Sequence, residues 1–142
     1  MNATIEKFGY PATLLREFDH WVVLLRPAQV TLGSLVLAAK SDATAYANLP
    51  TEAFAEQAEA IRAIEAALVQ FTRYERLNYL MLMMVDPHVH FHVIPRYSAE
   101  RSWNDLTFPD AGWPGPPKLD GAIKLAPEQI AALAGELSQL LG

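Results

Sequence analysis

The sequence has no cysteine among its 142 residues. Disulfide bonds, thiolate metal sites and cysteine nucleophiles are therefore excluded. Positive charge is also scarce, because 11 lysine and arginine residues stand against 16 acidic residues and leave a net charge of −5. A binder of duplex DNA or RNA normally presents a basic surface, so we expect no nucleic-acid partner. A small anionic ligand remains compatible with this charge, since local donors can outweigh the net charge.

Long apolar runs are missing as well. The longest run near the centre, residues 79–85, is far too short to span a bilayer. Residues 1–7 lack the apolar run that a signal peptide needs. We therefore expect no membrane partner and a cytoplasmic location. The length predicts one domain over residues 1–142, large enough to bury roughly two-thirds of its unfolded surface.

Three apolar runs predict strands. Residues 21–25 and 34–39 are separated by Pro27 and Gly33, which indicates an antiparallel pair. Residues 77–83 are almost continuously apolar, and we expect them to form a central strand of the sheet.

Other segments predict helices and loops. Apolar residues recur at three- and four-residue steps over 50–72 and 127–141, which is typical of amphipathic helices. Pro50 suits the first helical turn, where no N–H is needed. Residues 98–118 combine proline, glycine and tryptophan, so we expect a packed loop without regular structure. Near the N-terminus, Leu14, Leu15 and Phe18 suggest a short helical turn or loose packing.

Three of the four histidines lie within residues 86–96 at every second position. In a strand, successive side chains point to opposite faces, so His88, His90 and His92 would line one face. The residues between them, Val89, Phe91 and Val93, would face the core. Imidazole titrates near pH 6.5 and can act as nucleophile, proton donor or metal ligand.

Three interpretations of this row compete. The histidines can be purely structural, but a row of imidazoles stabilises nothing obvious. They can bind a metal, with a further ligand from His20, Asp86 or Asp19, although nothing marks any of these. They can also catalyse reactions at phosphorus. In that case one imidazole attacks a phosphate, and its neighbours hold the oxygens and assist the leaving group.

The stretch His88-Val-His90-Phe-His92-Val93-Ile94 resembles the histidine triad (HIT) pattern, in which alternating histidines are followed by two apolar residues. The ending Pro95-Arg96 and the order of strands, helix, strand and triad are also similar to that family. The resemblance implies an α+β fold with an antiparallel sheet of about five strands, a long central helix and a C-terminal helix.

The resemblance also implies a nucleotide hydrolase or nucleotidyl transferase. Such an enzyme cleaves a phosphoanhydride or P–N bond in a dinucleoside polyphosphate or nucleoside phosphoramidate. By this analogy His90 is the nucleophile at the α-phosphate, His88 orients it, and His92 contacts the phosphate and assists the leaving group. No metal or cofactor is implied as tightly bound, although Mg²⁺ can accompany a polyphosphate substrate. A homodimer is implied too, with the helix over residues 50–71 as a candidate interface.

The sequence departs from the family at several positions. The phosphate-contacting loop before the triad has shrunk to residues 84–87, and its Asp86 is acidic. Ser34 stands where many members carry a histidine, and Arg26 occupies the region of a ribose-binding asparagine or aspartate. These departures motivate an alternative, a nucleotide-binding HIT module without turnover. Two other polar residues, Asn78 and Arg96, are candidates for nucleotide binding, with structural roles as their alternatives.

Overall fold

The computed structural model describes residues 1–142. It contains three helices, nine strands and two short 3₁₀ turns. In chain order they are α1 (Ala3–Lys7), β1 (Leu14–Glu17), β2 (Trp21–Leu25), β3 (Ala28–Gln29), β4 (Leu35–Ala39), η1 (Tyr46–Asn48), α2 (Thr51–Thr72), β5 (Arg76–Leu80), β6 (His90–Arg96), β7 (Arg101–Trp103), β8 (Leu106–Phe108), η2 (Leu119–Gly121), β9 (Ile123–Lys124) and α3 (Pro127–Leu141). None of the helices is long and apolar enough to cross a membrane.

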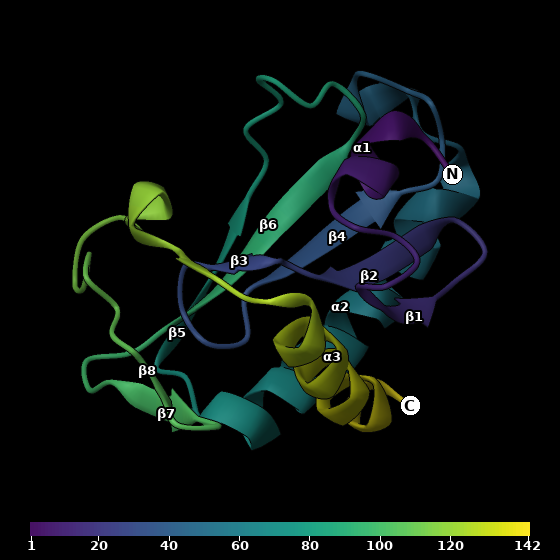
Figure 1. Cartoon of the computed structure of the whole chain (residues 1–142). Coiled ribbons are helices and arrows are strands. Elements are labelled where there is room, and N and C mark those ends of the chain that lie inside the picture. Colours follow the sequence, from purple (N-terminus) through teal and green to yellow (C-terminus); the bar gives the residue numbers. More distant parts are fainter.

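Five strands form one antiparallel sheet in the order β1-β2-β4-β6-β5 (Figure 1). The predicted pairing of residues 21–25 with 34–39 is confirmed, with Leu25 opposite Leu35. The α+β fold with five antiparallel strands is confirmed as well. Two small antiparallel ladders, β3 with β9 and β7 with β8, lie outside this sheet.

The strand predicted over residues 77–83 was placed wrongly in two respects. It lies at an edge of the sheet as β5, and its side chains there are at most half-buried. It also ends at Leu80, and Met83 has a left-handed φ of 52° that takes the chain out of extended geometry. An apolar run alone does not distinguish a central strand from an edge strand, because only the partners on each side decide that.

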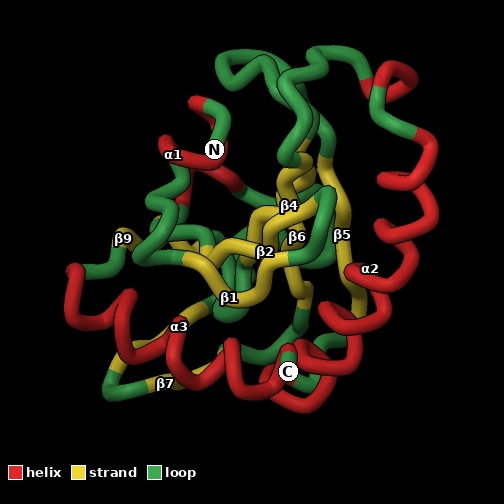
Figure 2. The backbone as a smooth tube through the Cα atoms, turned by 90° about the vertical axis from the view of Figure 1, so that its right-hand side faces the viewer, coloured by secondary structure: helices red, strands yellow, loops and turns green.

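Helices lie on both faces of the sheet (Figure 2). Along β2, Val23 and Leu25 belong to the large core together with residues of α2 and α3, whereas Leu24 belongs to a smaller core with Ile5 of α1. All five residues of β2 are buried as a result. This burial on both faces explains why the run is continuously apolar rather than alternating.

The two long helices agree with the sequence. α2 ends at Thr72 as expected, although Pro50 occupies the N-cap position just outside the first turn. α3 spans the predicted residues 127–141. The turn before β4 passes close to α2, and Gly33 adopts a φ of +92° there. A Cβ atom at Gly33 would lie 3.0 Å from the Cγ2 atom of Thr72, so glycine serves both the backbone and the packing.

Two further expectations were wrong. Leu14 and its neighbours form strand β1 rather than a helical turn, because β2 offers a pairing edge. The segment 98–118 contains the hairpin β7–β8, whose two-residue turn is Asn104-Asp105 with φ values of 52° and 65°. Asparagine and aspartate tolerate such left-handed angles, so this turn could have been predicted from the sequence.

Candidate active site

Strand β6 positions two of the three histidines. His90 and His92 point to the face of the sheet that α1 covers, and only 2% and 7% of their surfaces are exposed. Val93 packs into the large core on the opposite face, as the alternation predicts. The expectation that all three histidines share one strand was wrong, because β6 begins at His90 and His88 lies in the bend before it.

The bend gives His88 a role through its backbone. The Nδ1 atom of His90 lies 2.7 Å from the carbonyl oxygen of His88. A carbonyl can only accept, so Nδ1 of His90 carries the hydrogen and its Nε2 keeps a free lone pair. The ring of His88 is held separately, with its Nδ1 atom 2.9 Å from the hydroxyl of Thr4 in α1.

His92 has the opposite tautomer. The Nε atom of Arg26 donates to Nδ1 of His92 at 3.4 Å, so the hydrogen of the neutral imidazole is on Nε2. Burial, together with the nearby charges of Arg26 and His90, lowers the pKa of His92 to about 4. His92 is therefore neutral at pH 7. The ring centroids of His90 and His92 lie 5.2 Å apart, so the ring that keeps a lone pair on Nε2 neighbours the ring that carries its hydrogen on Nε2.

Helix α1 and the residue after it cover the histidines. The ring of Phe8 lies 5.7 Å from that of His90 and 5.6 Å from that of His92. Lys7 pairs with Asp86 at 2.8 Å. Asp86 is thus neutralised by a lysine rather than left facing the histidines as an unpaired charge.

The contact of Arg26 with His92 was not predicted from the sequence. Arg26 directly follows β2, whereas His92 lies 66 positions away in β6. Only the strand order β2-β4-β6 reveals their contact. The backbone N–H of Arg26 donates to the carbonyl of Ser34. Ser34, directly before β4, therefore lies opposite Arg26. The sequence offered one indication of the contact with His92. Arg26 lies two positions after the buried Leu24, and residues two apart on a strand share a face.

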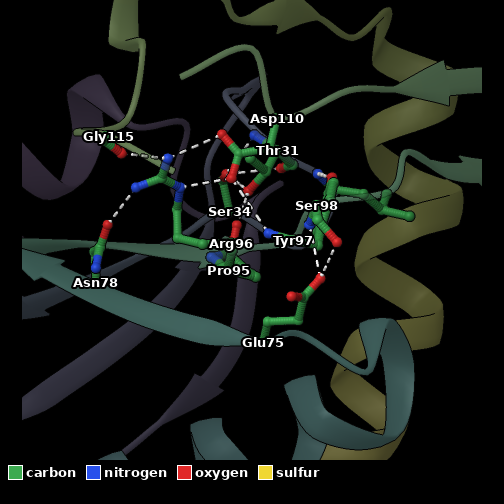
Figure 3. A network of polar contacts seen from close by, with 11 residues as sticks. Thr31, Ser34, Glu75, Asn78, Pro95, Arg96, Tyr97, Ser98, Asp110 and Gly115 are labelled. Atoms are coloured by element: carbon green, nitrogen blue, oxygen red, sulfur yellow. Dashed lines mark hydrogen bonds and ion pairs between the residues drawn. The ribbon is translucent and has the colours of Figure 1, made fainter. Parts of the chain in front are cut away.

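The two other predicted site residues lie together but away from the histidines. Nη1 of Arg96 donates to Oδ1 of Asn78 at 2.7 Å (Figure 3). Its Nε and Nη2 atoms bind the carboxylate of Asp110 at 2.7 and 3.1 Å, and Nη2 also donates to the carbonyl of Gly115 at 2.8 Å. This ion pair is almost fully buried.

Asn78 and Arg96 line a cavity of about 370 Å³ whose other residues are Arg76 and Trp113–Pro116. Arg96 is four residues beyond His92, which corresponds to about 13 Å along the strand. The charge of Arg96 is already neutralised by Asp110. Arg96 therefore holds the 109–116 segment against the sheet, and the structure does not bring it to the imidazoles.

The structure shows no set of side chains that supports the metal interpretation. No group of three or more histidine, cysteine, aspartate or glutamate side chains is arranged to hold a metal ion. The hydrogen bonds instead give His90 and His92 fixed and complementary tautomers. Such a pair can attack an electrophile through one ring and donate a hydrogen bond through the other.

Comparisons with known proteins support the fold. No protein-family model matches the chain, and no curated protein matches it. Among solved structures, a histidine triad protein of Sinorhizobium meliloti 1021 is similar with a TM-score of 0.75 and 20% identity, covering 98% of this chain and 94% of that one.

Two further solved structures agree with it. A histidine triad protein of Bradyrhizobium japonicum has a TM-score of 0.71 and 16% identity, over 100% of this chain and 97% of that one. A hypothetical histidine triad nucleotide-binding protein of Sulfolobus tokodaii strain 7 has a TM-score of 0.67 and 17% identity, over 97% and 89%. The fold of this chain is therefore that of histidine triad proteins, as the motif predicts.

Proposed function

We propose that this protein is a nucleotide hydrolase or nucleotidyl transferase that forms a covalent nucleotidyl intermediate on His90. One observation carries the proposal. The bond from Nδ1 of His90 to the carbonyl of His88 leaves the lone pair of Nε2 available for attack. The fold shared with a protein described as nucleotide-binding supports a nucleotide as the substrate.

The reaction has two steps. Nε2 of His90 attacks the α-phosphorus, a P–N bond to His90 forms, and the bond from phosphorus to the leaving group breaks. Water or another acceptor then attacks the same phosphorus and loses a proton to solvent, the P–N bond breaks, and the nucleoside monophosphate leaves with the new oxygen. The carbonyl of His88 holds the hydrogen on Nδ1 and stabilises the positive charge that the ring acquires.

His92 acts as a hydrogen-bond donor in this scheme. Because its pKa is lowered to about 4, it is neutral at pH 7 and offers its Nε2–H to a phosphate oxygen. A phosphate leaving group departs as an anion and needs no proton, whereas an amine leaving group must receive one. We therefore favour a phosphoanhydride substrate of the dinucleoside polyphosphate type over a phosphoramidate. Mg²⁺ would accompany the polyphosphate rather than occupy a protein site.

The assembly and location follow the same analogy. We propose that the protein is a homodimer in the cytoplasm. We place α2 in the interface because Phe54 and Val69 of this helix are 39% and 51% exposed. Apolar side chains exposed on one long helix suit contact with a second copy.

A non-catalytic nucleotide-binding module is the second candidate. It is favoured by the burial of His90, of which 2% is exposed beneath Phe8. The two candidates differ in turnover. In a module, nucleotides would bind and be recovered unchanged.

Release of nucleoside monophosphate tests the proposal. The panel holds diadenosine polyphosphates, adenosine phosphoramidate and their guanosine counterparts, assayed with wild type and His90→Ala. His20→Ala is the matched control, since His20 precedes β2 and is not part of the triad. We expect release by wild type and His20→Ala and none by a folded His90→Ala. Binding without release by wild type would favour the module.

A further inference from the structure

A cation without an acidic partner lies beside the histidines. Arg26 donates through Nε to His92 and through Nη1 to the carbonyl of Ala28, and neither group is negatively charged. The ion pairs of the structure all involve other residues: Lys7–Asp86, Arg16–Glu59, Lys40–Glu17 and Arg96–Asp110. Arg26 therefore differs from Arg96, whose charge is neutralised by Asp110.

One nitrogen of this cation is not used by the protein. Nη2 of Arg26 donates to no protein atom. Every side-chain nitrogen or oxygen that is sealed from solvent has a hydrogen-bond partner. Nη2 must therefore remain accessible. Burial lowers the pKa of Arg26, and no nearby carboxylate offsets that effect. An unpaired charge at a half-buried position is costly, and binding an anion relieves that cost.

The position of the guanidinium separates it from the phosphate that His90 attacks. Arg26 contacts the Nδ1 atom of His92, whereas the proposed mechanism uses the Nε2–H of the same ring to bind the scissile phosphate. The guanidinium and the phosphate would thus contact the same imidazole through different nitrogens. A group bound by Arg26 would therefore lie beside the scissile phosphate rather than coincide with it.

We propose that Arg26 forms a subsite for a second phosphate group of the nucleotide, adjacent to the phosphate that His90 attacks. The planar guanidinium suits this role, because it binds two phosphate oxygens at once. The acidic Asp86 of the loop before the triad is paired with Lys7. The subsite rests on the proposed function, which fixes where the first phosphate lies.

Two kinds of nucleotide carry such a second phosphate. It can be the next phosphate of a polyphosphate chain, or an ester on the sugar. The substrate class is in both cases a nucleotide with two phosphate groups, and a nucleoside monophosphate or phosphoramidate lacks the group that Arg26 binds. Three probes distinguish these sources: AMP, α,β-methylene-ADP and adenosine 3′,5′-bisphosphate.

Calorimetric titration of wild type, Arg26→Gln and Arg26→Lys with these probes tests the subsite. Glutamine keeps an N–H that can reach His92 but removes the charge. We expect wild type to bind one of the two-phosphate probes roughly tenfold or more tighter than AMP, because charge-assisted hydrogen bonds are strong. Arg26→Gln should lose that preference while its AMP affinity changes by less than about threefold. Arg26→Lys should retain part of the preference.

Arg62→Gln is the matched control, because it removes the same charge from an exposed position of α2. It should leave all three affinities unchanged. Equal affinity of wild type for the three probes would overturn the subsite, as would an equal loss for all three in Arg26→Gln. Binding needs no turnover, so a preference that depends on Arg26 stands even if no His90 intermediate forms. Absence of binding by every probe would overturn the subsite and the nucleotide site together.

Discussion

The ring of Phe8 lies against the imidazole of His90, with 5.7 Å between the ring centroids and 44° between their planes. Lys7, one residue earlier, pairs with Asp86 on the loop before the triad. These contacts tie the N-terminal segment to the candidate nucleophile and leave 2% of His90 exposed. A phosphate can reach His90 only if Phe8 or the loop moves aside.

Chemical labelling measures this cover. We expect diethyl pyrocarbonate to acylate His90 of wild type more slowly than half-buried His20, because the reagent must reach an imidazole nitrogen. Phe8→Ala should raise the rate at His90 several-fold and leave that at His20 unchanged. Peptide mass spectrometry over a time course resolves the two positions. Equal labelling of His90 and His20 in wild type would show that Phe8 does not restrict access.

The lowered pKa of His92 predicts acid sensitivity. The folded chain protonates His92 only near pH 4, whereas the unfolded chain does so near pH 6.5. Between these values the unfolded state binds the additional proton, so stability is lost as the pH falls from 6.5 towards 4. The contribution of His92 should be on the order of 2 kcal/mol. Urea unfolding at several pH values should show a smaller loss in His92→Asn than in wild type, and parallel curves would contradict the shift.

The ion pair of Arg96 with Asp110 predicts a large stability effect. Asp110→Ala would leave the buried guanidinium without its counterion, and we expect a loss of about 3–5 kcal/mol in the free energy of unfolding. Glu17→Ala removes the partner of Lys40 in a more exposed pair and should cost less than about 1 kcal/mol. Denaturant titration compares the two variants. A similar small loss in both would mean that the buried pair contributes little.

Two glycines offer a matched test of local packing. Gly33→Ala places a Cβ atom 3.0 Å from Thr72 at a φ of +92°, so we expect a loss of about 1–3 kcal/mol. Gly135 lies within α3 with no atom within 4 Å of such a Cβ, and alanine there should stabilise the protein by about 0.5–1 kcal/mol. Thermal melting shows both signs. A neutral Gly33→Ala would contradict the close approach of α2.

Local patterns were sufficient for much of the fold. The period of residues 50–72 and 127–141 predicted both long helices, and the apolar runs around Gly33 predicted the pairing of β2 with β4. These features depend on residues close in sequence. The edge position of β5 was not predictable in the same way, because it depends on which strand pairs with β6.

The candidate site shows the same division. The motif identified His90 and His92, since alternation along one strand is a local property. It did not reveal Phe8 or Arg26, which reach the histidines from the N-terminal segment and from the end of β2. The polar residues Asn78 and Arg96 were also predicted to bind the nucleotide, although Arg96 is occupied by Asp110. These features depend on contacts between segments that are distant in sequence, and such contacts cannot be identified from a single sequence.

Trapping the covalent intermediate tests the central claim most directly. Wild type is mixed with a dinucleoside polyphosphate, quenched with denaturant at neutral to alkaline pH to preserve the P–N bond, and analysed as intact protein and as peptides. We predict one nucleoside monophosphate attached at His90, and none in a folded His90→Ala. Release of nucleoside monophosphate without any adduct at His90, or an adduct on another residue, would contradict the mechanism.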